Sequence, residues 1–237
     1  MFVIIRFTII FLGIFLVGKY ALADDYAGAV QAAKAQNFAQ AKAILKTLAQ
    51  KGDVRAQAEL GGLLISGANS DQDTREGVMW IKSAADKGNA ISQYNLGNLY
   101  LEGKAVPLDY KQAMIWLLKA ADQNVPEAQL NIASMFADGE GVAQDYKEAA
   151  KWLKIAAANG NNDAQIALGR AYAQGVGVDK DPVRGFMWGQ IASEGSAMSD
   201  SERNSVRELA EKSLSKEDIA RANDLIKKCK DRKLKEC

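Results

Sequence analysis

Histidine is absent from the 237 residues, and the chain holds only two cysteines and three prolines. Without histidine there is no Ser–His or Cys–His nucleophile pair, no imidazole general base and no histidine-containing zinc site. An excess of one charge is also lacking, because 30 basic residues oppose 29 acidic ones for a net charge of +1. Most familiar hydrolase chemistry is thereby excluded and nucleic-acid binding is disfavoured. We expect no metal and no cofactor.

The composition favours helices. Proline is scarce, whereas the helix-forming residues Ala, Leu, Lys, Gln and Glu are abundant. With 48% hydrophobic and 25% charged residues, the chain can fold around a buried core. The sequence therefore predicts an all-α protein.

Residues 1–23 have the pattern of an export signal. Arg6 provides a short positive region, residues 7–18 an apolar core, and Ala21 to Ala23 a small-x-small cleavage site. An uncleaved membrane anchor is the alternative, but Lys19 ends the apolar run after about twelve residues, short of the roughly 18 to 20 that span a bilayer. We expect cleavage before Asp24, membrane contact only through the signal segment, and a periplasmic or secreted product.

Both cysteines, Cys229 and Cys237, lie within the last nine residues. An exported protein meets an oxidising compartment, where a structural disulfide between them is the natural expectation. A redox-active pair is the alternative, but it normally uses Cys-x-x-Cys spacing and a thiolate of low pKa. The spacing here favours the structural bond.

A period of 36 residues organises the rest of the chain. It is marked by one tryptophan in each interval: Trp80, Trp116, Trp152 and Trp188. The same step repeats a glutamine, a large aliphatic residue, a glycine and an aspartate: Gln57, Gln93, Gln129 and Gln165; Leu60, Leu96, Ile132 and Leu168; Gly67, Gly103, Gly139 and Gly175; Asp73, Asp109, Asp145 and Asp181. These positions define repeat 1 (53–88), repeat 2 (89–124), repeat 3 (125–160) and repeat 4 (161–196).

Each repeat is expected to form two helices, as in residues 128–136 and 146–157, where apolar residues recur every three or four positions. Between them, Gly139 suits a left-handed turn and Asp145 an N-cap. Capping boxes are predicted where a repeated aspartate is followed three residues later by Glu or Gln: Asp73 with Glu76, Asp109 with Gln112, and Asp145 with Glu148. The tryptophans are expected to pack in the core, with a ligand-stacking ladder as the alternative.

Repeat 3 resembles the Sel1-like repeat family, a TPR-like class. The resemblance is carried by Ala128, Ile132, Phe136, Gly139, Gly141, Val142, Asp145, Ala149, Trp152, Ala156, Ala157 and Gly160. Repeat 1 departs most, because Gly67-Ala-Asn-Ser replaces the Gly-x-Gly-Val turn and Leu64 replaces a tyrosine. The resemblance implies a right-handed α-solenoid of stacked helix pairs. In it, residues 24–52 form an N-terminal capping pair, and 197–237 hold closing helices over 201–213 and 217–228 and a basic tail.

The positions of each first helix that vary between repeats fall opposite the repeated, packing positions. In a solenoid they would form one continuous inner surface. Solvent exposure alone predicts the same variation, but apolar members such as Tyr94, Leu130 and Ile166 favour binding. The candidate partner-binding residues are Tyr94, Asn95, Asn98, Glu102, Leu130, Asn131, Ser134, Asp138, Ile166, Arg170 and Gln174.

The resemblance implies an exported, non-catalytic scaffold or adaptor that holds a protein or peptide on its concave face, and we expect a monomer. The rival hypothesis is a penicillin-binding or β-lactamase-like enzyme, because a cysteine-rich branch of the family is linked to that chemistry. The four repeats contain no cysteine and no Ser-x-x-Lys motif, and the letters from Ser213 to Lys216 fall outside them. A further alternative is that the basic tail touches anionic lipid or an acidic partner: Lys227, Lys228, Lys230, Arg232, Lys233 and Lys235.

Overall fold

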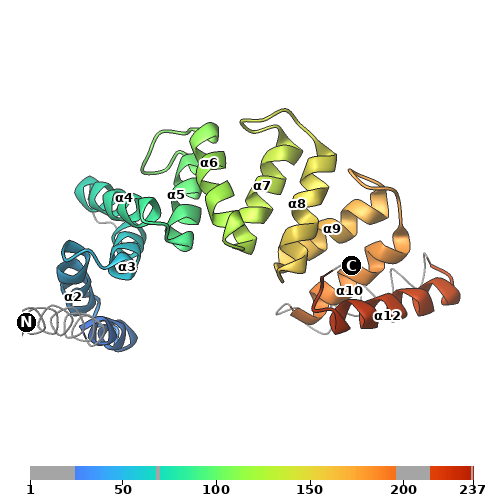
Figure 1. The fold of residues 1–237 in the computed structure, drawn as a ribbon, viewed down its shortest axis with the longest axis horizontal. Helices are drawn as coiled ribbons and strands as arrows, with labels where there is room; N and C mark the ends of the chain where they lie inside the picture. Colours follow the sequence, from blue (N-terminus) through green and yellow to red (C-terminus); the bar gives the residue numbers. More distant parts are fainter. Residues whose placement is uncertain (1–24, 68–69, 196–213, 236) are drawn as a thin grey trace, which may run out of the picture. The chain divides into compact units, whose positions relative to one another are not determined.

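The computed structural model describes residues 25–67, 70–195, 214–235 and 237, and within them it contains helices and no strand (Figure 1). A helix over 25–34 precedes the following helices along the chain: α2 (Phe38–Gln50), α3 (Val54–Ser66), α4 (Asp71–Asp86), α5 (Ala90–Glu102), α6 (Tyr110–Asp122), α7 (Pro126–Asp138), α8 (Tyr146–Ala158), α9 (Asn162–Gln174), α10 (Pro182–Gly195) and α12 (Lys216–Asp231). The all-α prediction is confirmed, with two helices in each repeat. The export signal and the helix expected over 201–213 lie outside the described residues.

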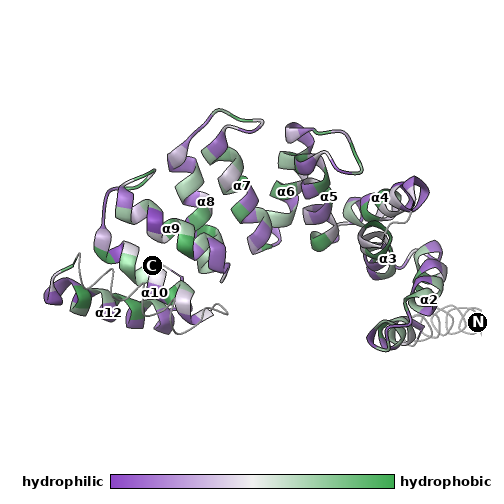
Figure 2. Ribbon diagram, turned by 180° about the vertical axis from the view of Figure 1, so that it is seen from behind, coloured by the Kyte–Doolittle hydropathy of each residue, from purple (hydrophilic) through white to green (hydrophobic). Residues whose placement is uncertain are grey.

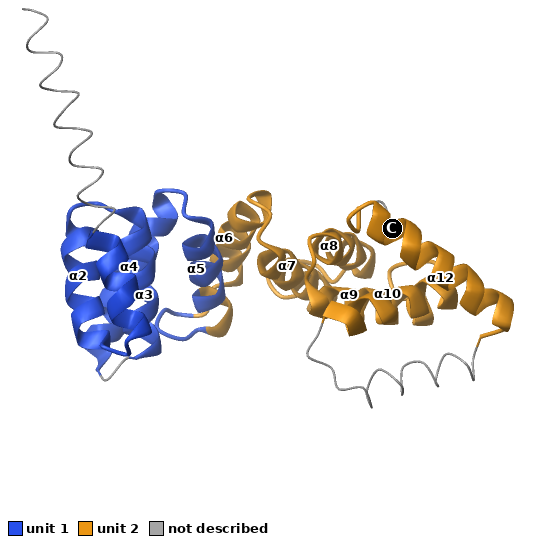
Figure 3. Cartoon of the chain, turned by 90° about the horizontal axis from the view of Figure 1, so that it is seen from below, with its two compact units in different colours: residues 1–99, 103–107 blue, residues 100–102, 108–237 orange. Residues whose placement is uncertain are grey.

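The chain divides into two compact units (Figure 3). Unit 1 comprises residues 1–99 and 103–107, and unit 2 comprises 100–102 and 108–237, so the boundary falls inside repeat 2. In unit 1, α3 packs against α2 and α4. In unit 2, the helices from α6 to α10 pack each against the next, and α12 packs against α10. Contacts between helices adjacent in sequence are the arrangement of an α-solenoid.

Repeated glycines and aspartates mark the helix ends in repeats 2 and 3. Gly103 and Gly139 adopt left-handed backbone conformations, with φ of 63° and 75°, at the ends of α5 and α7. Asp109 and Asp145 cap α6 and α8, because each carboxylate accepts hydrogen bonds from the backbone N–H groups two and three residues later. The predicted left-handed turns and aspartate N-caps are confirmed in these repeats. The predicted capping boxes are not formed, because the N–H groups of Asp109 and Asp145 donate to the carbonyl oxygens of Tyr100 and Phe136.

The corresponding cap in repeat 1 was predicted wrongly. Helix α4 begins at Asp71 and is capped by Ser70, so Asp73 lies within its first turn. The Asp73 carboxylate accepts a hydrogen bond from Ser70 Oγ and pairs with Lys42 Nζ at 3.1 Å, while Glu76 pairs with Lys46 at 2.8 Å. Gly67 has φ of −104°. Without the left-handed glycine turn of the later repeats, the second helix starts earlier and the aspartate serves an ion pair.

The repeated glutamines link each repeat to the helix before it. Gln57, Gln93, Gln129 and Gln165 are all buried. Their Nε2 groups donate to backbone carbonyl oxygens near the end of the preceding helix, at 3.0 to 3.2 Å: those of Ala49, Ala85, Ala121 and Ala157. A buried amide is costly without a partner, which explains why a polar residue recurs in the core.

The repeated tryptophans differ in burial. Trp116 is 7% exposed and Trp188 is 2% exposed, which confirms core packing at these two positions. Trp80 and Trp152 are only half-buried, although Trp80 still packs against the core cluster of unit 1. The deepest repeated contacts come instead from the aliphatic series, since Leu60, Leu96, Ile132 and Leu168 are all fully buried. Along the helices, hydrophobic residues alternate with hydrophilic ones (Figure 2).

Capping helices cover both ends of the array. Near the N-terminus, Leu45 and Leu48 of α2 pack in one cluster with Leu60 and Leu64 of α3. Near the C-terminus, Ser215 caps α12 by accepting from the N–H of Asp218 at 3.1 Å, as the sequence predicts.

Helix α12 also brings the cysteine pair into the core of unit 2. Cys229 is buried in the cluster that contains Met187 and Trp188 of α10. It is joined to Cys237, with the two Cα atoms 5.4 Å apart. The cysteine pairing expected from the sequence is therefore present in the structure, where it ties the chain end to the last repeat.

Candidate functional site

The candidate partner-binding residues of repeats 3 and 4 form two exposed stripes in unit 2. On α7 and α9 they stand away from the buried positions, and we call them together the α7–α9 face: Leu130, Asn131, Ser134, Asp138, Ile166, Arg170 and Gln174. Ser134, Asp138, Arg170 and Gln174 are exposed, and the other three are half-buried. The structure thus leaves all seven side chains at least partly accessible to a partner.

The candidates of repeat 2 divide between the two units. Tyr94, Asn95 and Asn98 belong to unit 1 and are half-buried, whereas Glu102 belongs to unit 2 and is exposed. Helix α5 buries Gln93, together with Ser92, Leu96 and Gly97, on its packing side. The candidate side chains therefore occupy positions outside the packing stripe here as well.

The apolar candidates are less available than the sequence suggests. Tyr94, Leu130 and Ile166 are all half-buried. Leu130 packs against the core cluster of unit 2 that contains Leu168 and Tyr172. Part of its apolar surface already serves folding, so the exposed polar members of the α7–α9 face are its most accessible groups.

Large apolar side chains are instead exposed on the second helices, which the sequence reasoning missed. They are Met79 on α4, Ile115 and Leu118 on α6, and Tyr146 and Ile155 on α8. A signal was present, because Ile115 and Met79 directly precede a tryptophan of the packing stripe and so fall beside it.

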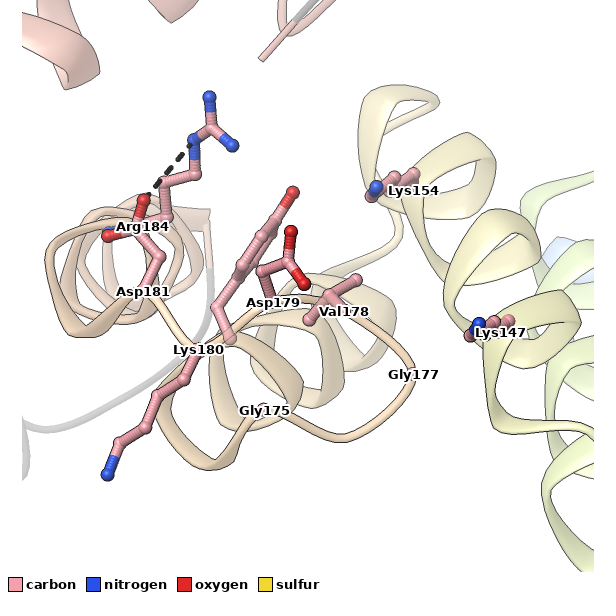
Figure 4. A pocket seen from close by; sticks show the side chains of 10 residues that line it. Lys147, Lys154, Gly175, Gly177, Val178, Asp179, Lys180, Asp181 and Arg184 are labelled. Carbon is pink, nitrogen blue, oxygen red and sulfur yellow. Dashed lines mark hydrogen bonds and ion pairs between the residues drawn. The ribbon is translucent and has the colours of Figure 1, made fainter.

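A pocket of about 740 Å³ lies in unit 2 between α8, the α9–α10 loop and α10 (Figure 4). We call it the basic pocket. Its charged lining comprises Lys147 and Lys154 on α8, Asp179, Lys180 and Asp181 in the loop, and Arg184 on α10. In Figure 4, Asp179 and Val178 lie between the two helices, while the side chain of Lys180 extends away from α8.

Tyr172, at the end of α9, is the aromatic element of this pocket and is 6% exposed. Lys154 Nζ and Arg184 Cζ each lie 5.7 Å from the centroid of its ring. Two cations from different helices thus approach one aromatic ring, an arrangement that cation–π attraction favours.

The acidic side chains of the pocket have unequal roles. Asp181 accepts from the backbone N–H of Arg184 at 3.0 Å, and its other oxygen lies 3.8 Å from Arg184 Nε. Asp181 is therefore occupied in capping α10. Asp179 stands between the walls and offsets part of their positive charge.

The preceding junction, where the 139–145 loop meets α6, has a different chemistry. Tyr110 Oη donates to Glu140 Oε1 at 3.2 Å, and this bond to a carboxylate raises the pKa of Tyr110. Lys151 pairs with Glu148 on α8, and the hydrogen bond to Glu148 raises the pKa of the Lys151 ammonium group. The cation and the tyrosine at this junction are thus already bonded within the chain.

Part of the basic tail is also paired within the chain. Lys228 forms an ion pair with Asp224 at 2.6 Å, and Lys230 pairs with Glu194 of α10. The Lys230 pair joins α12 to α10, whereas the Lys228 pair lies within α12, so two of the tail cations are engaged inside the chain.

Within residues 25–67, 70–195, 214–235 and 237, no group of three or more His, Cys, Asp or Glu could hold a metal ion. In the same residues, no helix is both long and apolar enough to cross a bilayer.

Comparison with solved structures finds similar repeat proteins. A protective antigen of uropathogenic Escherichia coli with the SLR fold is 38% identical, with a TM-score of 0.62, over 65% of this chain and 33% of its own, so this chain spans about a third of it. A Sel1 repeat protein from Oxalobacter formigenes is 28% identical, with a TM-score of 0.67, over 72% of this chain and 70% of its own. A Klebsiella pneumoniae Sel1 repeat protein, 18% identical over 80% of this chain and 93% of its own with a TM-score of 0.51, shares the fold.

A comparison with curated proteins found no match. The family model of the Sel1 repeat matches four consecutive segments, 54–89, 90–125, 126–161 and 162–196. These matches begin one residue later than the repeats defined by the 36-residue period and cover more than half of the chain. The chain belongs to the Sel1 repeat family.

Proposed function

We propose that this chain is an exported, non-catalytic scaffold that captures a protein or peptide on the variable face of its first helices. Sel1 repeat proteins generally mediate protein–protein interactions, and the family is typically one of non-enzymatic scaffolds. In unit 2 the proposed docking surface is the α7–α9 face. In unit 1, Tyr94, Asn95 and Asn98 form a separate candidate contact.

One observation carries the proposal: repeats 3 and 4 keep their buried positions and change their accessible ones. Ile132 and Leu168 are equivalent and fully buried, and Gln129 and Gln165 make the same hydrogen bond. At the equivalent exposed positions, Ser134 becomes Arg170 and Asp138 becomes Gln174. A scaffold that packs identically but presents different polar groups is suited to recognising an asymmetric partner.

The non-catalytic assignment is supported by the chemistry of the repeats. They contain neither histidine nor cysteine nor a Ser-x-x-Lys motif. The Tyr172 ring and the cations of the basic pocket can bind a charged group, but they include no activated nucleophile. Turnover of a β-lactam reporter above that of the heat-denatured chain would overturn this part of the proposal.

Export is proposed from the sequence of residues 1–23 and from the cysteine pair. Cys229 and Cys237 lie at bonding distance, as expected for a protein that reaches an oxidising compartment. Mass spectrometry of the protein from its native envelope is expected to give an N-terminus at Asp24. An intact Met1 to Ala23 segment would support an anchor instead.

The test is crosslinking of the tagged chain in its native envelope, followed by mass spectrometry and capture with surface variants. Arg170→Glu is expected to weaken capture of the crosslinked partner, because it reverses an exposed charge on the α7–α9 face. Lys111→Glu is the matched control, since Lys111 is exposed on α6, outside that face. Tyr94→Ala tests the unit 1 contact separately.

Thermal melts of all variants separate binding from folding, because exposed substitutions usually change stability by less than about 0.5 kcal/mol. Loss of capture with Arg170→Glu alone, at unchanged stability, supports the docking surface. Equal capture by wild type, Arg170→Glu and Tyr94→Ala would show that the partner binds elsewhere.

A further inference from the structure

The basic pocket arises from changes at positions that are repeated elsewhere in unit 2. Lys154 on α8 occupies the repeat position of Leu118 on α6, and Arg184 on α10 occupies that of Glu148 on α8. In the loops, Lys180 replaces Gln144. Three cations therefore stand at the junction of repeats 3 and 4 where the preceding junction has an apolar, an acidic and a neutral residue.

These substitutions change the charge of the junction without changing its scaffold. Gly139 and Gly175 both adopt left-handed conformations, with φ of 75° and 78°, and Asp145 and Asp181 each cap the following helix. The pocket lining carries four cations, Lys147, Lys154, Lys180 and Arg184, against Asp179 and Asp181. The fold does not require this positive excess, because the preceding junction is built without it.

The cations are accessible and remain available to a ligand. Lys147, Lys154 and Arg184 are exposed. The Arg184 guanidinium has a long contact to Asp181 Oδ2, at 3.8 Å, and lies 5.7 Å from the centroid of the Tyr172 ring. Over residues 25–67, 70–195, 214–235 and 237, the Tyr172 hydroxyl has no hydrogen-bond partner. Ammonium, guanidinium and phenol groups all donate to anionic oxygens.

We infer that the basic pocket binds an acidic segment of a protein partner, with carboxylate side chains placed between α8 and α10. This inference rests on the proposed function, since it names the chemistry of one part of a protein ligand. It concerns a surface distinct from the α7–α9 face.

The size and layout of the pocket favour an extended peptide over a single small anion. Its volume of about 740 Å³ is that of a site for a ligand of many atoms. The cations stand on both helical walls with Asp179 between them, so an anion placed midway between the walls would face that carboxylate. Carboxylates on alternate residues of an extended segment lie about 7 Å apart on one face, and they can reach one wall each.

The experiment uses the full mature chain and a fluorescein-labelled peptide of alternating Glu and Ser, with the matched Gln and Ser peptide as the uncharged probe. Fluorescence anisotropy is measured for wild type, Lys154→Leu and Arg184→Gln. Both replacements occur naturally at these repeat positions, as Leu118 and Gln112, so they are compatible with the fold. Lys82→Leu is the matched control, because Lys82 holds the same repeat position in repeat 1 and pairs with Asp86.

We expect the Glu peptide to bind wild type and the Gln peptide not to bind. Each pocket variant should weaken the Glu peptide at least about tenfold, whereas Lys82→Leu should change its affinity less than about twofold. Affinity should also fall as salt rises, because the contacts are between charges. Equal binding by the pocket variants and Lys82→Leu would overturn the assignment.

Two further probes test the other possible ligands. Inorganic phosphate, or vesicles containing an anionic phospholipid, that compete at lower concentration than the unlabelled Glu peptide would show that the pocket serves an anion other than an acidic peptide. The titrations need no native partner, so their failure leaves the Arg170→Glu capture result standing. Conversely, a loss of Glu-peptide affinity in the pocket variants alone would support the pocket assignment even if Arg170→Glu left partner capture unchanged.

Discussion

Repeats 3 and 4 share a scaffold and differ in what they present. Both bury an aliphatic residue, Ile132 or Leu168, and both use a buried glutamine to reach the preceding helix. Their accessible positions diverge, and Lys154 of repeat 3 and Arg184 of repeat 4 place cations around the loop of repeat 4. The comparison teaches that packing and recognition occupy separate residue positions in this chain, so that one can change while the other is kept.

The two repeats also differ in the burial of their equivalent tryptophans. Trp188 is 2% exposed and sits in the cluster with Met187 and Cys229, which α12 covers. Trp152 is half-buried. The same repeat position therefore has different energetic weight, depending on which helix covers it.

The largest expected effect comes from the tryptophans. Replacing Trp188 with Ala should lower the free energy of unfolding by about 3 to 5 kcal/mol, because it leaves a cavity in the core. Trp152→Ala should cost at least about 1 kcal/mol less, since part of that ring is already in water. Urea unfolding followed by circular dichroism measures both. Equal losses would show that the difference in burial has no energetic consequence.

The next effect concerns the end that α12 closes. Cys237→Ser should lower stability by roughly 2 to 3 kcal/mol, the loop-closure contribution of a short disulfide loop. Cys237 is chosen because Cys229 is buried, where a hydroxyl would add its own cost. Non-reducing peptide mapping of wild type should show the pair linked. Two free thiols, or a dimer joined through them, would contradict the intramolecular bond.

The glutamines test what the repeats have in common. Gln129→Ala and Gln165→Ala should each cost about 1 to 3 kcal/mol, because each removes a buried side-chain hydrogen bond to the carbonyl oxygen of Ala121 or Ala157, which keeps only its backbone donors. Similar urea midpoints for the two variants would sharpen the comparison. A loss confined to one repeat would break the shared-scaffold account.

The smallest effect lies in repeat 1. There Glu76, which was predicted to complete a capping box with Asp73, forms an ion pair with Lys46 instead. The hydrogen bond from Lys46 lowers the pKa of Glu76 below its ordinary value of 4.5. This contribution is present above that ordinary value and is lost as the pH falls through the lowered pKa. Glu76→Gln should therefore cost less than about 1 kcal/mol near pH 7, and progressively less as the pH falls below 4.5 and through the lowered pKa. A difference from wild type that grows in acid would contradict the pairing.

Local sequence patterns were sufficient to predict the repeats and most of their turns. The 36-residue step and the caps Asp109, Asp145 and Ser215 follow from spacing and side-chain chemistry that act within a few residues. In repeat 1 the equivalent aspartate, Asp73, lies within the first turn of α4 instead of capping it. The loop sequence differs there, and Ser70 caps the helix. The 36-residue period alone cannot show which of these two residues, Ser70 or Asp73, caps the helix.

Surface properties were harder to predict because they depend on neighbouring repeats. The period places every tryptophan alike, yet burial of Trp152 and Trp188 depends on the helix that covers each one. The basic pocket was not predicted from the sequence, for the same reason. Its cations are scattered through the sequence from Lys147 to Arg184, and only the packing of α8, α9 and α10 brings them to one cavity.

The most direct test of the central claim is site-specific photo-crosslinking in the native envelope. A photoreactive amino acid is placed at Ser134, exposed on the α7–α9 face, and in a parallel strain at Ile155, exposed on α8. If the first-helix face docks the partner, Ser134 should give a single crosslinked protein and Ile155 should give none. Crosslinks from Ile155 with none from Ser134 would contradict the claim and place docking on the second helices.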